Sequence, residues 1–205
     1  MNRASALFLL LLCSVALLAF YQALFPLPTS TSFIRFLGLS GFFLLCITLI
    51  IGPLSVLWPK AYAVLIEPRR ATGIASFVFL LAHFLLVLTT VFSFNLAFIF
   101  SVHSNLTAFL AFLILIALTL TSNDFSIRVL GAGNWKNFQR LTYLAFVLAF
   151  AHFLLKVEGL AIQNIRGTTV YNLAQLALIA LGIITILLQL AGFYVRIKRK
   201  AAAPA

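Results

Sequence analysis

Residues 69–91 read RRATGIASFVFLLAHFLLVLTTV: two arginines precede 21 residues without Asp, Glu, Lys or Arg, and His83 lies within that run. Residues 139–157, QRLTYLAFVLAFAHFLLKV, repeat this order, with His152 inside the apolar part. A helix needs about 20 apolar residues to cross a hydrocarbon core of about 30 Å. We therefore predict two membrane-spanning helices, each with a histidine deep within it.

The composition extends this prediction to the whole chain. It is 64% hydrophobic and only 8% charged, with a mean hydropathy of +1.18, whereas about a quarter of the residues of soluble domains are charged. We predict an all-α fold, a six-helix transmembrane bundle that forms a single integral membrane domain over residues 1–205. The apolar stretches lie near residues 6–25, 36–57, 72–92, 105–121, 141–157 and 172–195. The first resembles a secretory signal but lacks a clear cleavage site, so we expect it to be retained as a helix.

The net charge of +11 invites a nucleic-acid interpretation, which the distribution of the charges excludes. Only Arg35, Lys156 and Arg166 fall on one side of the predicted topology. This asymmetry predicts that both termini are cytoplasmic, in a multi-pass protein of the cell inner (plasma) membrane whose basic tail contacts membrane lipid. The eleven basic residues on the other side are Arg3, Lys60, Arg69, Arg70, Arg128, Lys136, Arg140, Arg196, Lys198, Arg199 and Lys200.

Few other side chains could carry chemistry inside the bundle. The three acidic residues, Glu67, Asp124 and Glu158, lie outside the predicted apolar core, so a carboxylate proton relay is disfavoured. Zinc is disfavoured too, because two histidines alone leave it under-coordinated. Cys13 and Cys46 lie within apolar spans and are expected to pack as small hydrophobic residues.

The two helical histidines lie at matched depth. His83 follows Arg70 by 13 residues and His152 follows Arg140 by 12, so at ~1.5 Å per residue both lie ~18–20 Å from the same membrane face. Ionisable groups at that depth are usually functional, and we predict that both bind one haem iron. A bis-histidine iron has no open position, which suits electron transfer. The alternative is that each histidine only braces a neighbouring helix.

His103 is a separate case. It follows His83 by twenty residues, or about 30 Å along a continuous helix, so it cannot ligate the same iron unless the chain turns back. We expect a surface histidine in the external turn; contact with a haem edge or a partner is the alternative.

Three stretches resemble the ferric-reductase-like transmembrane superfamily, and within it the haem-binding membrane subunits of methionine sulfoxide reductase systems (MsrQ/YedZ type). Residues 47–59, ITLIIGPLSVLWP, are similar to the family's Thr-rich turn into Pro-Leu. Residues 69–83, RRATGIASFVFLLAH, are close to its double-arginine, Leu-Gly, aromatic and histidine pattern. Residues 121–152, TSNDFSIRVLGAGNWKNFQRLTYLAFVLAFAH, are similar to its Thr-Ser-Asn loop, Leu-Gly, Trp-Lys and Arg-Leu-x-Tyr-Leu run. The resemblance covers approximately residues 36–157.

The resemblance implies that His83 and His152 are haem ligands in a b-type cytochrome. It also implies that Arg69 and Arg70 lie at the cytoplasmic mouth, where they could meet an anionic flavin or a haem propionate; anchoring at the membrane interface is the alternative. The family typically has a histidine where this chain has Gln139. We therefore expect one haem b, near the external face, and some ~20 Å between it and a cytosolic donor, a gap that FMN or a quinone would have to shorten.

The function that follows is electron relay from a quinol or reduced flavin to an external, periplasmic oxidoreductase, by resemblance a methionine sulfoxide reductase. The chain would be an electron-transfer subunit rather than a self-sufficient enzyme, since it carries no Gly-rich nucleotide motif after a strand. One alternative is a ferric or cupric reductase membrane component. Another is a haem-free structural or assembly subunit.

Overall fold

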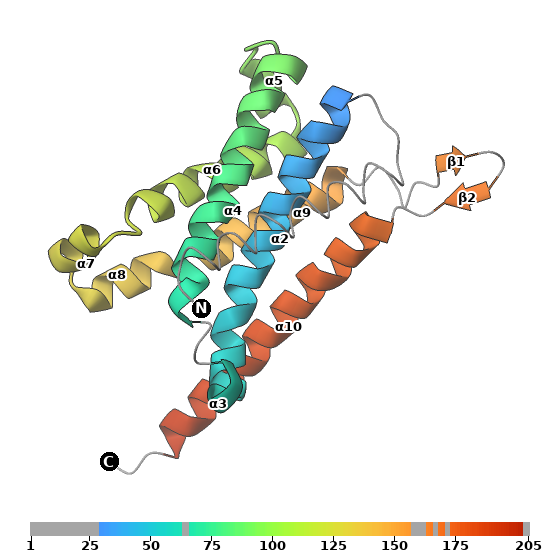
Figure 1. Cartoon of the computed structure of the whole chain (residues 1–205). Helices are drawn as coiled ribbons and strands as arrows, with labels where there is room; N and C mark the ends of the chain where they lie inside the picture. Colours follow the sequence, from blue (N-terminus) through green and yellow to red (C-terminus); the bar gives the residue numbers. More distant parts are fainter. Residues whose placement is uncertain (1–28, 63–65, 157–162, 166–167, 171–172, 203–205) are drawn as a thin grey trace.

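The computed structural model describes residues 29–62, 66–156, 163–165, 168–170 and 173–202. They form a bundle of helices with one small hairpin beside it (Figure 1). In chain order the elements are α2 (Thr29–Leu57), α3 (Pro59–Tyr62), α4 (Ile66–Leu86), the π-helical turn η2 (Val87–Val91), α5 (Ala97–Ser101), α6 (His103–Leu120), α7 (Asp124–Leu130), α8 (Ala132–Gln139), α9 (Thr142–Lys156), β1 (Gln163–Ile165), β2 (Thr168–Val170) and α10 (Leu173–Ala201).

The predicted helical class is confirmed, and the number of helices in part. Five segments are long and apolar enough to cross a membrane, and they coincide with five of the six predicted spans. The predicted helix at residues 6–25 lies outside the described residues, as does Cys13. The five segments are Phe33–Leu57, Arg69–Val91, His103–Leu120, Ala132–Lys156 and Gln175–Arg199.

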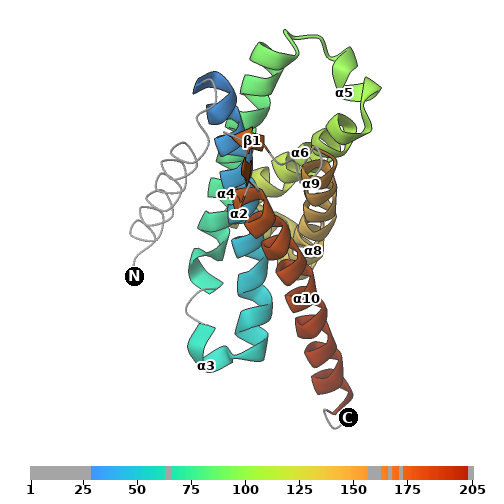
Figure 2. The ribbon, with the colours of Figure 1, turned by 90° about the vertical axis from the view of Figure 1, so that its right-hand side faces the viewer.

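Helix α2 is the centre of the bundle. It packs along α4 and α10, while α6 and α9 form a second pair, and smaller α2–α9 and α4–α6 contacts join the two groups (Figures 1 and 2). The shared core is a buried cluster from four of these helices, and it includes Cys46, which packs as a small hydrophobic residue as predicted. Its members are Phe42, Leu45, Cys46, Leu49, Leu115, Leu118, Ala145, Phe146, Phe150 and Leu178.

Small residues let α2 and α4 approach closely. A Cβ at Gly41 would lie 2.6 Å from Cγ of Leu80, so only glycine fits there without a shift. At the same level the buried Ser76 hydroxyl on α4 donates a 2.7 Å hydrogen bond to the Gly41 carbonyl. Close backbone approach and interhelical hydrogen bonds are typical of helix pairs in membranes. The close packing of α2 against α4 therefore fixes the positions of the side chains on α4.

The outer surface is apolar over most of the bundle's length. On α10, Ile183, Leu187, Leu190 and Phe193 are all exposed. Exposed apolar surface of this extent marks contact with a membrane or a partner, and the five spans make lipid its natural environment. The multi-pass membrane character predicted from the sequence is thus confirmed.

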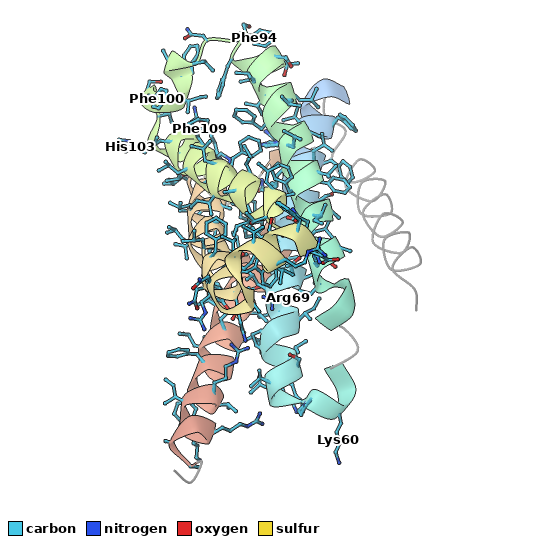
Figure 3. All side chains as sticks on the ribbon, turned by 90° about the vertical axis from the view of Figure 1, so that its left-hand side faces the viewer. Lys60, Arg69, Phe94, Phe100, His103 and Phe109 are labelled. Atoms are coloured by element: carbon cyan, nitrogen blue, oxygen red, sulfur yellow. The ribbon has the colours of Figure 1, made fainter. Side chains whose placement is uncertain are left out.

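The two ends of the bundle differ in chemistry. Lys60 lies at one end, and Phe94, Phe100 and His103 lie at the other (Figure 3). The C-terminal end of α10 also lies at the Lys60 end, whereas α7 and α8 lie beside the bundle, level with the lower part of α4 (Figures 1 and 2). We call the two ends the basic end and the aromatic end.

Two segments between the predicted apolar stretches contain regular structure. Residues 121–140 hold α7 and α8, joined at Gly131, whose φ of 75° favours glycine. Asn123 begins α7 because its side chain accepts a 2.7 Å hydrogen bond from the Ser126 amide. The segment between the last two stretches contains the antiparallel hairpin β1–β2, with Asn164 opposite Thr169.

Candidate functional site

His83 lies on α4, and its ring rests against α2. Its Nδ1 lies 2.8 Å from the carbonyl oxygen of Ile34. The contact depends on Gly38, since a Cβ there would lie only 3.0 Å from Nδ1 and 3.1 Å from Cε1 of the ring. Glycine on α2 therefore makes the space that this imidazole occupies.

His152 on α9 is held in the same way by a different helix. Its Nδ1 lies 2.7 Å from the carbonyl oxygen of Ser104, a buried residue in the first turn of α6. Ile34 and Ser104 are both near the aromatic end of their helices. Each histidine is thus anchored to a backbone carbonyl near the start of a neighbouring helix, α2 for His83 and α6 for His152.

These hydrogen bonds determine which nitrogen of each ring is available. A carbonyl oxygen can only accept, so Nδ1–H must donate, and the neutral ring then carries its lone pair on Nε2. Within the described part of the chain, neither Nε2 has a hydrogen-bonding partner. Histidines that bind metals commonly donate their other N–H to a backbone carbonyl in this way. Both rings therefore have the tautomer and support that an axial ligand needs.

The residues that follow the two histidines in the sequence take part in aromatic stacks. Phe84 stacks on Phe112 with ring centroids 4.5 Å apart. Phe153 stacks on Phe42 at 5.3 Å. Offset aromatic stacks provide large, rigid apolar surfaces.

Arg69 lies in the first turns of α4 and contacts α2. Its Nε donates a 3.0 Å hydrogen bond to the Thr48 carbonyl on α2, and its guanidinium packs over Gly52. Both of these contacts are with α2.

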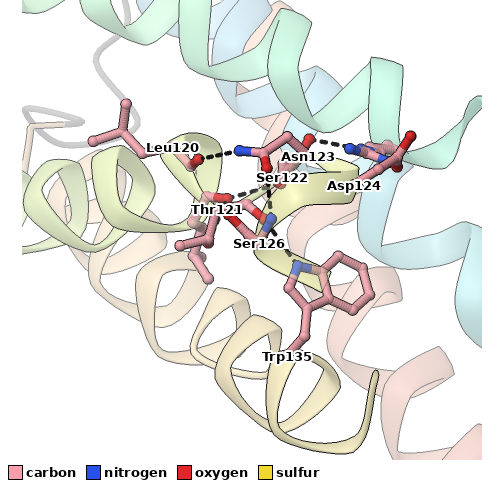
Figure 4. Close-up of polar contacts among 9 residues, drawn as sticks. Leu120, Thr121, Ser122, Asn123, Asp124, Ser126 and Trp135 are labelled. Atoms are coloured by element: carbon pink, nitrogen blue, oxygen red, sulfur yellow. Dashed lines mark hydrogen bonds and ion pairs between the residues drawn. The ribbon is translucent and has the colours of Figure 1, made fainter. Parts of the chain in front are cut away.

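Arg70 faces the connection between α6 and α7 instead. Its Nε donates to the Ser122 carbonyl at 2.7 Å, and its Nη1 pairs with Asp124 at 2.8 Å (Figure 4). The Trp135 indole closes the same turn by donating to the Thr121 carbonyl at 2.9 Å. In the described contacts both arginines hold helices together, a role that the sequence interpretation did not include.

Gln139 is the last residue of α8 and is partly buried. Its amide nitrogen lies 3.2 Å from both the Leu118 carbonyl and the Thr121 hydroxyl on α6. The side chain thus fastens α8 to the end of α6, which a primary amide does well. A primary amide is a poor ligand for haem iron compared with the imidazole of histidine.

His103 begins α6 and is exposed at the aromatic end (Figure 3). In the described ranges, no three side chains of His, Cys, Asp or Glu gather as a metal site. The sequence did not point to the functional roles of Ile34, Ser104 and Gly38. Two of these act through backbone carbonyls, and only the small size of Gly38 could have drawn attention.

Comparison with known proteins places the chain beside a set of bacterial membrane subunits. No family model matches it. It is 31% identical over 140 residues to the protein-methionine-sulfoxide reductase heme-binding subunit MsrQ of Agrobacterium fabrum, covering 65% of this chain and 62% of that protein. The subunits of the same name from Brucella ovis and Brucella suis are 31% identical over 136 residues, covering 64% of this chain and 60% of theirs. The chain therefore spans about three-fifths of the length of these curated relatives.

Proposed function

Since the chain is a relative of MsrQ haem-binding subunits, we propose that it binds haem b and passes electrons across the membrane to an external oxidoreductase. From the names of its relatives, we propose that this partner is a methionine sulfoxide reductase. The observation that carries the proposal is the pair of helical histidines, His83 and His152. Each donates Nδ1–H to a carbonyl and presents Nε2.

The donor set fits haem iron. The Nε2 atoms of His83 and His152 would hold the iron, and the bound group would supply one-electron transfer. The chain's own residues hold the rings. Ile34 and Ser104 fix the tautomer of each histidine, and Gly38 leaves space for one ring.

We propose one haem per chain. Both histidine rings lie toward the aromatic end, and at the basic end the Gln139 amide contacts α6 where the resembling family has a histidine. An electron from the basic side must then cover about 20 Å by the helical rise between Arg70 and His83. A quinol or reduced flavin such as FMN, bound between these levels, is the proposed donor.

The proposed orientation puts the basic end in the cytoplasm. Lys60 and the last turns of α10, which carry Arg196, Lys198 and Arg199, lie at that end (Figures 1 and 3). By the positive-inside rule we propose that His103 and the hairpin are outside, with both termini inside and six helices in the inner membrane. We propose that residues 1–205 form a single membrane domain with a ferric-reductase-like core at about 36–157.

Haem content of the purified chain tests the proposal. We expect a reduced-minus-oxidised spectrum of low-spin bis-histidine haem and, by pyridine haemochrome, one haem per chain. His83→Ala or His152→Ala should lose most of it, while His103→Ala should keep it as the matched control. Full haem content in the His83 or His152 variant would reject the ligand assignment. Two haems per chain would reject the proposal of a single haem that is based on Gln139.

The partner requires a separate measurement. In inverted membrane vesicles the external face of the membrane lines the lumen. The reduced haem should be reoxidised when a methionine sulfoxide reductase and methionine sulfoxide are supplied inside the vesicles. Reoxidation by chelated ferric iron with no protein partner would instead support a metal reductase.

A further inference from the structure

A cavity of about 270 Å³ opens near the basic end, between α2, α9 and α10. It lies away from the two histidines, and neither lines it. Its walls come from Pro53 of α2, Tyr143 of α9, and Gln189, Leu190, Phe193 and Arg196 of α10. No step of the proposed electron relay involves the residues that line this cavity.

The charge around this cavity is positive and lacks a described counter-charge. Arg196 lines the cavity. The Arg69 guanidinium is close enough to Arg196 for the two positive charges to repel each other. Among the residues whose side chains are described, no carboxylate contacts either arginine, and Asp124 is paired with Arg70. Like charges held together at a membrane surface favour an anion between or beside them.

The mouth of the cavity is apolar and faces outward. Leu190 and Phe193 are 61% and 62% exposed on the side of α10 that carries the other exposed apolar residues. An occupant of this site therefore combines an anionic head at Arg196 with a long apolar part along α10. Phospholipids of the adjacent leaflet have that chemistry.

We propose that this cavity binds one anionic phospholipid, with its phosphate at Arg196 and Tyr143 and its acyl chains along Leu190 and Phe193. Only the assignment to the cytoplasmic leaflet rests on the proposed orientation. The site itself does not depend on haem or on electron transfer.

A lipid fits these walls better than an electron donor does. A flavin ring needs several free hydrogen-bonding groups at its polar edge, but the Gln189 amide already donates to the Leu49 carbonyl at 2.7 Å. A neutral quinone gives Arg196 no negative charge to pair with. The phosphate monoester or diester group accepts from guanidinium and hydroxyl donors together.

Native mass spectrometry of the full chain in detergent tests the site with three probes: phosphatidylglycerol, diacylglycerol and inorganic phosphate. We expect one retained phosphatidylglycerol, no retained diacylglycerol, and no displacement of the lipid by millimolar phosphate. Arg196→Gln should weaken phosphatidylglycerol binding about tenfold or more, the size of one charge-assisted hydrogen bond. The matched control is Arg199→Gln, which removes the same charge one turn later on α10 and should bind as the wild type does.

A second pair of variants tests the apolar mouth. Leu190→Trp should block lipid retention, whereas Leu187→Trp, one turn away on the same exposed face, should not. Equal weakening by the two arginine variants would overturn the proposal in favour of diffuse charge attraction. Displacement by phosphate, or by FMN or a quinol, would overturn it in favour of a free anion or a donor site. Haem content is measured in the same samples, so a chain without haem that still discriminates between these variants refutes only the electron relay.

Discussion

Replacing Gly38 by alanine should weaken haem binding while leaving the bundle folded. The new Cβ would lie 3.0 Å from Nδ1 and 3.1 Å from Cε1 of His83, closer than ordinary van der Waals contact. The ring must then move by a few tenths of an ångström, and the Nδ1–H bond to Ile34 at 2.8 Å must lengthen. Alanine is the better helix former by up to about 1 kcal/mol, so α2 itself should not unravel.

The size of the effect follows from the role of that hydrogen bond. A neutral hydrogen bond contributes about 1 kcal/mol, and changes to groups that support a metal ligand usually lower metal affinity by about 10- to 100-fold. We expect a loss in this range, about 1.4–2.8 kcal/mol of binding free energy. Titration of the apoprotein with haemin, followed by absorbance, measures the affinity, and electron paramagnetic resonance of the ferric protein reports the altered axial ligand.

The matched control is Gly73→Ala on α4. A Cβ there would lie 3.5 Å from the Thr48 methyl group, an ordinary contact, so haem affinity should stay at the wild-type value. If Gly38→Ala binds haem as tightly as Gly73→Ala and has the same resonance spectrum, His83 does not hold the iron in the way we infer.

Three further changes test the packing. Gly182→Ala should cost about 1–3 kcal/mol of unfolding free energy by overpacking, measured by steric trapping in bicelles, because its Cβ would lie 2.7 Å from the buried ring of Phe150. Gln139→Ala should cost about 1 kcal/mol in the same assay and leave haem content unchanged, since its amide contacts only α6 in the described structure. A double-mutant cycle of Arg70→Gln and Asp124→Asn should give a coupling of no more than about 1 kcal/mol, because the pair is 36% and 78% exposed.

Each of these has a result that would contradict it. Gly133→Ala is the control for Gly182→Ala, because nothing lies within 4 Å of the Cβ position at Gly133. If Gly182→Ala and Gly133→Ala are equally stable, Gly182 on α10 does not pack against Phe150 on α9 as described. Loss of haem in the Gln139 variant would place a cofactor near α8. A large, salt-independent coupling would mean that the ion pair is shielded from solvent.

Sequence periodicity and length predicted the membrane helices well because one physical requirement governs them. A span must be apolar and about 20 residues long, and α6 at His103–Leu120 closely matches its predicted bounds of 105–121. Helices α7 and α8 escaped prediction because they have only seven and eight residues. Elements this short show no long apolar repeat and depend on local signals such as the cap at Asn123.

The assignment of His83 and His152 as a shared site rests on their spacing from Arg70 and Arg140 and stays a prediction. The carbonyl partners of the two rings could not be predicted from the sequence, because any residue offers the same carbonyl oxygen and only the packing of α2 and α6 selects Ile34 and Ser104. The contacts of Arg70 were missed because they depend on the turn after α6, which supplies the Ser122 carbonyl and Asp124.

The way the histidines are held has a consequence for how the protein matures. His83 and His152 are 69 positions apart in the sequence, and each is oriented by a carbonyl from a helix other than its own. A nascent chain that has inserted only α2, α4 and α6 has one ligand, and the carbonyl of Ser104 has no ring to hold. Under the proposed ligation by both histidines, haem capture follows the insertion of α9 and is a late step in biogenesis. Bound haem would then report that these four helices have assembled, and membrane quality control could distinguish finished from unfinished chains by that criterion alone.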